Sequence, residues 1–144
     1  MFGEDAADTS GASELEENAV AKSASDMVSE AKAQVECLDP DALETELGSG
    51  DVVLVDLRDS EEVTAGGRIP GSIHVPRGML EFRADPSSTY HKEPLDPSKR
   101  VILHCGSGGR SSLGAVTLKS MGYTNVAHLE GGMKAWKEAG KPVE

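Results

Sequence analysis

The amino-acid sequence predicts an α/β fold in which a mainly parallel central sheet is flanked by helices on both faces. Two observations predict it. Short apolar runs typical of buried strands alternate along the chain with segments of helical periodicity. The run 52–56 is rich in β-branched residues and leucine, as in a strand buried on both faces. Because strands that alternate with helices form parallel sheets covered on both sides, three layers are expected.

The expected elements follow one another in a regular order. Strands are expected at 34–38, 52–56, 73–76, 101–104 and 125–129, and helices at 13–34, 39–48, 60–65, 111–121 and 133–139. In the helix at 39–48, an aspartate cap precedes a proline in the first turn and a glycine ends the helix. Residues 77–98 hold several prolines, which predicts a helical turn around 79–82 and then a surface loop.

The chain divides into an acidic N-terminal segment, residues 1–34, and one domain, residues 35–144. Residues 1–36 carry nine acidic residues and two lysines, and they account for most of the net charge of −11. We expect the first 12 or so residues to be disordered and the helix at 13–34 to have only a thin apolar stripe. Such a helix packs on the domain, mediates self-association or is loosely attached, and we favour loose attachment.

Composition excludes several classes of function. A negative net charge argues against nucleic acid and anionic membranes as partners. No apolar run approaches the roughly 18 residues that span a bilayer, and the N-terminus lacks the features of a signal peptide, so we expect a cytoplasmic protein. No cofactor or metal site is expected, because the two cysteines form no CxxC motif. We interpret Cys37 as a small buried hydrophobic residue, with a role as a resolving thiol as the alternative.

The segment 101–112 carries the predicted chemistry. An apolar strand ends in Cys105, a glycine-rich loop follows, and Arg110 precedes a helix. A helix N-terminus and a nearby cation stabilise a thiolate, so Cys105 is the predicted nucleophile. The residues expected to supply backbone N–H donors for an anion are Gly106, Ser107, Gly108 and Gly109. Arg110 either binds an oxyanion or anchors the loop to a carboxylate.

Other polar residues lie near the ends of predicted strands. Asp56 and Arg58 follow a strand at the edge where parallel α/β folds place ligands, and we interpret them as a charge pair that supports the site. His104 precedes the nucleophile but faces away from it, because successive strand residues point to opposite faces. The other histidines show no ligand spacing, and Trp136 is expected in the core.

Several ordered motifs resemble those of single-domain rhodaneses, a family of sulfurtransferases. They are Val53–Arg58 followed by Glu62, Gly67–Ile73, the CxxGxR loop from Cys105 to Arg110, and Leu129–Met133 leading to Trp136. The resemblance covers residues 35–144. It implies a rhodanese-like fold and transfer of sulfane sulfur from a donor such as thiosulfate to cyanide or a thiol through a Cys105 persulfide. The implied partners are a small sulfur-containing anion and a thiol acceptor or partner protein.

One residue departs from the family pattern, and two other functions compete with sulfur transfer. Arg68 stands where many rhodaneses have histidine; we expect it to pair with Asp59, Glu61 or Glu62 rather than face the pocket. Phosphatases and arsenate reductases also use a cysteine–arginine loop, but the phosphatase signature places one residue more between the two than the four found here. A non-catalytic binding module or persulfide carrier is the second alternative.

Overall fold

The computed structural model describes residues 21–144, so the first part of the predicted helix at 13–34 lies outside the described residues. The helices are α1 (Ala24–Gln34), α2 (Pro40–Ser49), α3 (Ser60–Gly66), the 3-10 helix η1 (Arg77–Met79), α4 (Leu80–Ala84), α5 (Gly109–Ser120) and α6 (Gly132–Glu138). The strands are β2 (Glu36–Leu38), β3 (Val52–Asp56), β4 (Ile73–His74), β5 (Arg100–His104) and β6 (Val126–Leu129). Each expected element is present, and for most of them the observed ends differ from the expected ones by a few residues.

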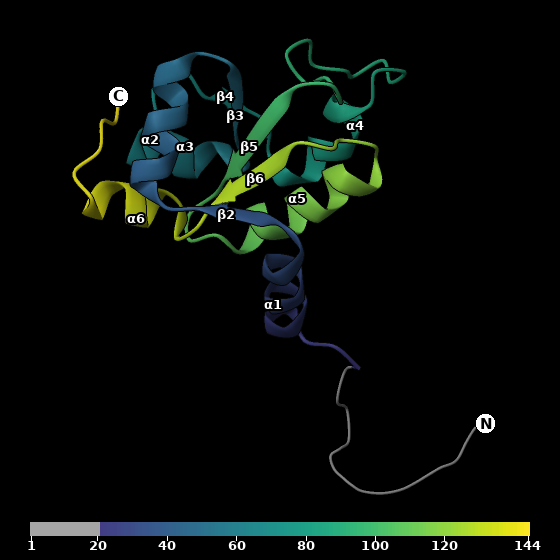
Figure 1. Cartoon of the computed structure of the whole chain (residues 1–144), viewed down its shortest axis with the longest axis horizontal. Coiled ribbons are helices and arrows are strands. Elements are labelled where there is room, and N and C mark those ends of the chain that lie inside the picture. Colours follow the sequence, from purple (N-terminus) through teal and green to yellow (C-terminus); the bar gives the residue numbers. More distant parts are fainter. Residues whose placement is uncertain (1–20) are drawn as a thin grey trace, which may run out of the picture.

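Within residues 21–144 the strands form one five-stranded sheet in the order β2-β6-β5-β3-β4, and each neighbouring pair is parallel. This confirms the predicted fold class (Figure 1). Strands β3 and β5 pair along their whole length, from Val52 opposite Arg100 to Asp56 opposite His104. The carboxyl ends of these two strands therefore meet at one edge of the sheet, and the predicted site residues follow directly from that edge.

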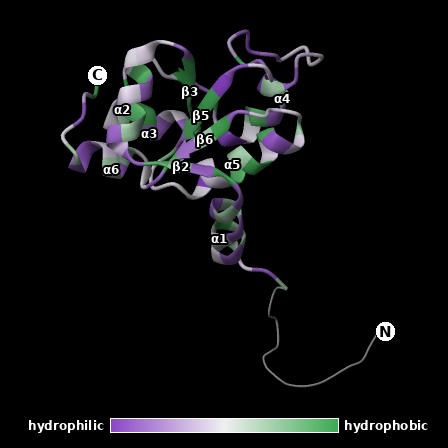
Figure 2. Cartoon of the chain, in the orientation of Figure 1, coloured by the Kyte–Doolittle hydropathy of each residue, from purple (hydrophilic) through white to green (hydrophobic). Residues whose placement is uncertain are grey.

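The two faces of the sheet bury separate hydrophobic clusters. Val101 and Leu103 of β5 pack in the cluster that includes residues of α4 and α5, whereas Ile102 between them packs with Trp136 of α6. This alternation follows from the strand geometry, in which successive side chains point to opposite faces. Hydrophobic colour follows the central strands and α5 in Figure 2. Helices thus cover both faces, and Trp136 lies in the core as predicted, 1% exposed.

Helix α1 packs against α5. It begins after Ser23, whose side chain accepts a hydrogen bond from the N–H of Asp26 while the Asp26 carboxylate accepts one from the N–H of Ser23. Ala31 is buried at this contact, and Lys119 Nζ of α5 donates to the carbonyl of Gln34 at 2.8 Å. In the described part of the chain the helix begins at Ala24 and packs on the domain, so the favoured expectation of loose attachment is wrong for residues 24–34.

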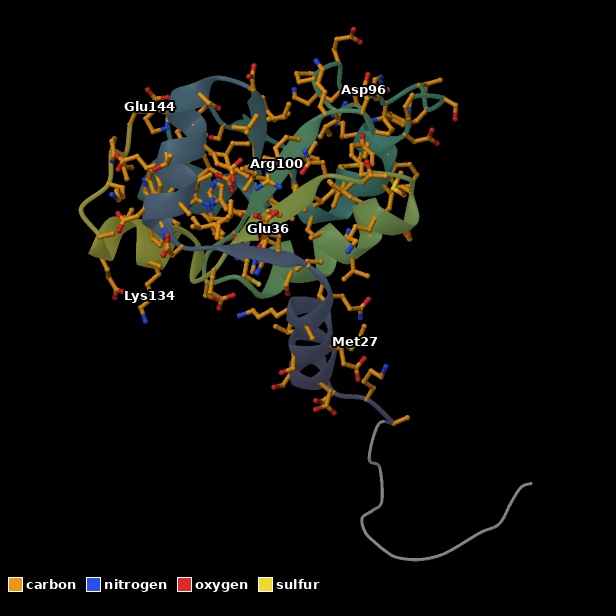
Figure 3. The ribbon with its side chains drawn as sticks, in the orientation of Figure 1. Met27, Glu36, Asp96, Arg100, Lys134 and Glu144 are labelled. Carbon is orange, nitrogen blue, oxygen red and sulfur yellow. The ribbon has the colours of Figure 1, made fainter. Side chains whose placement is uncertain are left out.

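An arginine holds together the amino edge of the sheet, opposite the predicted site. Arg100 at the start of β5 forms an ion pair with Glu36 of β2 at 2.8 Å and with Glu46 of α2 at 2.6 Å (Figure 3). The hydrogen bonds that Arg100 donates to Glu46, and then those to Glu36, raise its pKa. Among residues 21–144, no helix combines the length and apolar character that crossing a membrane requires.

Candidate active site

The Cys105 side chain is buried just beyond the carboxyl end of β5, under the first turn of α5. It is 1% exposed and belongs to the hydrophobic cluster on the α5 side of the sheet. Backbone N–H groups donate to its Sγ atom from Gly108, at 3.2 Å, and from Ser111, at 3.4 Å. Gly108 is the residue that caps α5, with φ of +109°, a backbone conformation that favours glycine. The loop therefore closes around the sulfur atom itself.

The first turn of α6 holds the loop in this orientation. Met133 N–H donates to the carbonyl of Cys105 at 2.8 Å, and Lys134 N–H donates to the carbonyl of Gly106 at 3.1 Å. The approach is so close that a Cβ atom on Gly132 would lie 2.5 Å from the Cys105 oxygen. Because these carbonyls point at α6, they point away from the sulfur and leave the loop amides free to face it. The glycine pair 131–132 is thus a turn against the rim of the site.

Two side chains that the sequence did not single out contact the nucleophile or its neighbour. Ser111 Oγ lies 3.6 Å from Cys105 Sγ and is hydrogen-bonded to His128 Nδ1 at 2.9 Å. Ser111 and His128 are both fully buried. Burial lowers the pKa of His128, and the lowering effect of Lys32 partly offsets the raising effect of Glu130, so the imidazole is neutral near pH 7. A chain of polar groups therefore runs from the sulfur to the surface at Glu130.

The predicted anion-binding residues have different surroundings. Ser107 is exposed, Gly106 and Gly109 are half-buried, and the amide of Gly108 is the one of these four with a described hydrogen bond to Sγ. The second described donor, Ser111, comes from the first turn of α5, because the helix begins at Gly109 rather than Ser111. The residue that caps this helix is Gly108, in a left-handed conformation.

Arg110 makes the anchoring contact that its position allowed. Its guanidinium donates two hydrogen bonds to Glu62 of α3, at 2.7 and 3.0 Å, so the pairing is bidentate. The Arg110 hydrogen bonds, followed by the N–H of Asp59, lower the pKa of Glu62 to about 2. Arg110 Nη2 would lie 3.2 Å from a Cβ on Gly106, so the guanidinium sits directly beside the loop. The pair joins α3 to the loop and keeps a cation beside the nucleophile.

Asp56 and Arg58 form a buried ion pair on the adjoining strand. Arg58 Nη2 donates to Asp56 Oδ2 at 2.8 Å and to the carbonyl of Gly67 at 2.7 Å. Burial alone would raise the pKa of Asp56, but the hydrogen bonds from Arg58 and the proximity of His104 lower it below its ordinary value. The described side-chain hydrogen bonds of Asp56 and Arg58 are with each other and with backbone groups, and none is with Cys105. This agrees with the interpretation of the two residues as a charge pair that supports the site.

His104 lies beside this ion pair, on the other side of the sheet from Cys105. Its Nε2 atom is 3.6 Å from Asp56 Oδ2, and the side chain is fully buried. Burial lowers the pKa of His104 despite the neighbouring carboxylate, so the two groups do not form an ion pair near neutral pH. The prediction that His104 faces away from the nucleophile is confirmed.

Two sequence-based expectations need correction. Arg68 pairs not with a nearby acid but with Glu144, at 3.7 Å, and it also donates to the carbonyl of Ser72. The chain after α6 returns to Arg68, and reciprocal backbone hydrogen bonds of 3.0 and 2.9 Å join residues 68 and 144. Cys37 is exposed rather than buried, because β2 is an edge strand and Leu38, not Cys37, points into the core.

The fold and loop together define an α/β domain with a buried cysteine in a backbone cradle at the carboxyl edge of a parallel sheet. The model of the rhodanese-like domain family matches residues 39–139, so the chain belongs to that family. A mouse thiosulfate sulfurtransferase/rhodanese-like domain-containing protein 3 is 33% identical over 99 residues, which span 65% of this chain and 63% of that protein. A sulfurtransferase from Allochromatium vinosum is 32% identical over 93 residues, 65% of this chain and 78% of that protein.

A solved structure resembles the chain over most of its length. It is a protein of unknown function from Rhodopseudomonas palustris, described as a possible tyrosine phosphatase. The two are 40% identical with a TM-score of 0.82, and the match covers 89% of this chain and 98% of the other. A match of this extent reaches beyond residues 39–139, the part that the family model covers.

Proposed function

We propose that the chain is a sulfurtransferase that moves sulfane sulfur from a donor such as thiosulfate to cyanide or a thiol through a Cys105 persulfide. One observation carries the proposal: the amides of Gly108 and Ser111 donate to the sulfur of Cys105 in a loop that ends at a helix N-terminus. These dipoles stabilise negative charge on sulfur, first on the thiolate and then on the persulfide. Family membership and the sulfurtransferase name of a relative support the same reaction class.

The reaction has two covalent steps. The Cys105 thiolate attacks the outer sulfur of thiosulfate; a new S–S bond forms, the old S–S bond breaks, and sulfite leaves with the bonding electron pair. The acceptor then attacks the terminal sulfur of the persulfide; with cyanide, a C–S bond forms, thiocyanate leaves, and the thiolate is restored. Such a scheme predicts ping-pong kinetics. Arg110 beside the loop supplies a positive charge for an anionic donor.

Phosphate-ester hydrolysis is the second candidate, because the Rhodopseudomonas palustris protein is described as a possible tyrosine phosphatase. The loop geometry argues against it. Gly108 N–H already approaches Sγ at 3.2 Å, and four residues separate Cys105 from Arg110. A tetrahedral phosphate needs donors arranged around an atom beyond the sulfur, whereas a persulfide adds a single atom. The described contacts fit the smaller group.

The decisive experiment is intact-mass spectrometry after incubation with thiosulfate. We expect the wild-type chain to gain the mass of one sulfur atom and to lose it again on addition of cyanide. The two cysteines provide matched variants: Cys37→Ser keeps the adduct and Cys105→Ser abolishes it. Thiocyanate formation, measured in parallel, is expected to follow the same pattern.

Other outcomes of this experiment would overturn the proposal or indicate another function. No adduct with thiosulfate or any other sulfane donor would overturn the sulfurtransferase proposal. An adduct that forms but is not passed to cyanide or thiols would indicate a persulfide carrier. Hydrolysis of p-nitrophenyl phosphate that depends on Cys105, without a sulfur adduct, would establish the phosphatase function instead.

A further inference from the structure

Strand pairing brings three metal-binding residue types together on the α1 and α5 side of the sheet. In the parallel pairing of β2 with β6, Cys37 lies directly opposite His128. Glu130 follows His128 by two residues and therefore points to the same face. One sulfur, one nitrogen and one oxygen atom from these side chains lie within 4.8 Å of one another. The cluster is separate from the loop amides that surround Cys105.

The imidazole of His128 has an unused nitrogen that faces the cluster. Its side chain is fully buried, and among the described residues Nε2 has no hydrogen-bond partner. The nearest carboxylate oxygen, Glu130 Oε1, is 3.3 Å away but lacks hydrogen-bond alignment. Buried polar atoms are rarely left unpaired, so this nitrogen needs an explanation. A cation between Nε2, the carboxylate and the thiol provides one.

We propose that Cys37, His128 and Glu130 bind a divalent transition-metal ion of the Zn²⁺ type. Thiolate, imidazole and carboxylate are the ligand types that zinc prefers, and three protein ligands leave a fourth position for water. Two ligand atoms at about 2.0–2.2 Å from one tetrahedral zinc ion are about 3.4 Å apart. The 3.3 Å between His128 Nε2 and Glu130 Oε1 already has that spacing. Cys37 is exposed, and its thiol contacts the carbonyls of Val35 at 3.6 Å and Lys32 at 3.7 Å, contacts that a metal-bound thiolate gives up when it completes the site.

The neighbouring groups are compatible with a bound ion. Lys32 Nζ of α1 contacts Glu130 Oε2 at 2.7 Å, which leaves Oε1 for the metal. Ser111 Oγ, 2.9 Å from His128 Nδ1, is the hydrogen-bond partner that a metal-binding histidine requires on its other nitrogen. On binding, the metal replaces the Cys37 thiol proton, which is released to solvent.

The site is joined to the nucleophile by one hydrogen-bond chain. A metal on Nε2 fixes the imidazole proton on Nδ1, where it is donated to Ser111 Oγ. The Ser111 hydroxyl proton, which has the carbonyl of Gly108 as an acceptor at 3.3 Å, can then turn to the Cys105 sulfur, 3.6 Å away, and stabilise a thiolate there. This link rests on the proposed function, whereas the metal site itself does not.

A titration of the full chain with Co²⁺ alone tests the site, because cobalt replaces zinc and reports a thiolate ligand by a sulfur-to-metal charge-transfer band in the near ultraviolet. We expect one equivalent of Co²⁺ to produce the band and Zn²⁺ to abolish it. The two cysteines are again the matched pair: Cys105→Ser keeps the band and Cys37→Ser loses it. Circular dichroism verifies that each variant is folded.

Three further variants test the other residues of the site, and two results would overturn the proposal. Glu130→Gln and His128→Gln each weaken Co²⁺ binding, and Ser111→Ala weakens it by about 10–100-fold, as removal of a group that orients a ligand does. A band that survives Cys37→Ser but not Cys105→Ser would overturn the proposal, because the metal would then bind the nucleophile. The absence of any band in the wild-type chain would overturn it as well. Neither result affects the thiosulfate adduct on Cys105.

Discussion

Two buried histidines on neighbouring strands have opposite relations to the nucleophile. His104 on β5 and His128 on β6 are both fully buried, and among residues 21–144 these are the side chains with an unpartnered Nε2. His104 is adjacent to Cys105 in sequence but lies at the Asp56–Arg58 pair. His128 is distant in sequence but is bonded to Ser111, next to the sulfur. The face of the strand, not closeness in sequence, therefore decides which histidine reaches the chemistry.

The largest effect is expected on the His104 side of the sheet. Asp56→Ala leaves the Arg58 guanidinium buried without its partner, and breaking a buried ion pair in this way lowers the free energy of unfolding by about 3–5 kcal/mol. Urea denaturation measures the loss. Glu36→Gln, at an exposed member of the Arg100 pairing, is the control and is expected to cost no more than about 1 kcal/mol. Equal losses in the two variants would contradict a special role for the buried pair.

A pH effect is expected from both histidines together. Burial lowers the pKa of each in the folded state, so below about pH 6.5 the unfolded chain binds protons that the folded chain does not. Stability therefore falls as pH drops below 6.5, by up to about 1.4 kcal/mol per pH unit for each histidine. Urea denaturation between pH 7.5 and pH 5 measures the slope, and His128→Gln is expected to reduce it. A flat profile in the wild-type chain would show that neither histidine is held neutral.

A smaller effect, on activity, is expected on the His128 side. Ser111→Ala removes the hydroxyl group 3.6 Å from the sulfur. A hydrogen bond to a charged group contributes about 1.5 kcal/mol, so its loss is expected to slow persulfide formation about 10-fold. Single-turnover kinetics with thiosulfate measure the rate. Ser112→Ala is the matched control, since both hydroxyl groups donate to the carbonyl three residues earlier but Ser112 has no described contact with the sulfur. If the two variants react equally fast, Ser111 has no part in the first step.

The smallest effect is expected at the Arg110–Glu62 pair, which lies beside the loop but is partly exposed. Since the folded-state pKa of Glu62 is about 2, its contribution to stability is complete above about pH 4.5 and is lost as pH falls toward 2. Glu62→Gln is expected to lower stability at pH 7 by no more than about 1 kcal/mol. It also leaves Arg110 without its counter-charge, so the KM for thiosulfate falls. An increase in KM, measured against Glu46→Gln as control, would contradict this.

The order of strands and helices followed from local patterns, and so did the Asp56–Arg58 pair, because its members are two residues apart. Other contacts depend on which strands are neighbours. The approach of Cys37 to His128 needs the β2–β6 register, and the pairing of Arg68 needs the chain beyond α6 to return to it. Alternation along β6 places His128 on the face of Val126, which was the one signal in the sequence for its position.

The close approach of Gly132 affects which substitutions the loop from Cys105 to Arg110 can tolerate. Carbonyls of the loop that accept hydrogen bonds from α6 hold the loop amides in their orientation, and the Ser107 side chain takes no part in these bonds. Ser107 is exposed and can therefore vary without changing the cradle, whereas any side chain at position 132 would collide with the backbone of residues 105 and 106. A residue outside the CxxGxR motif, Gly132, therefore limits which backbone conformations the cysteine loop can adopt and which substitutions it tolerates.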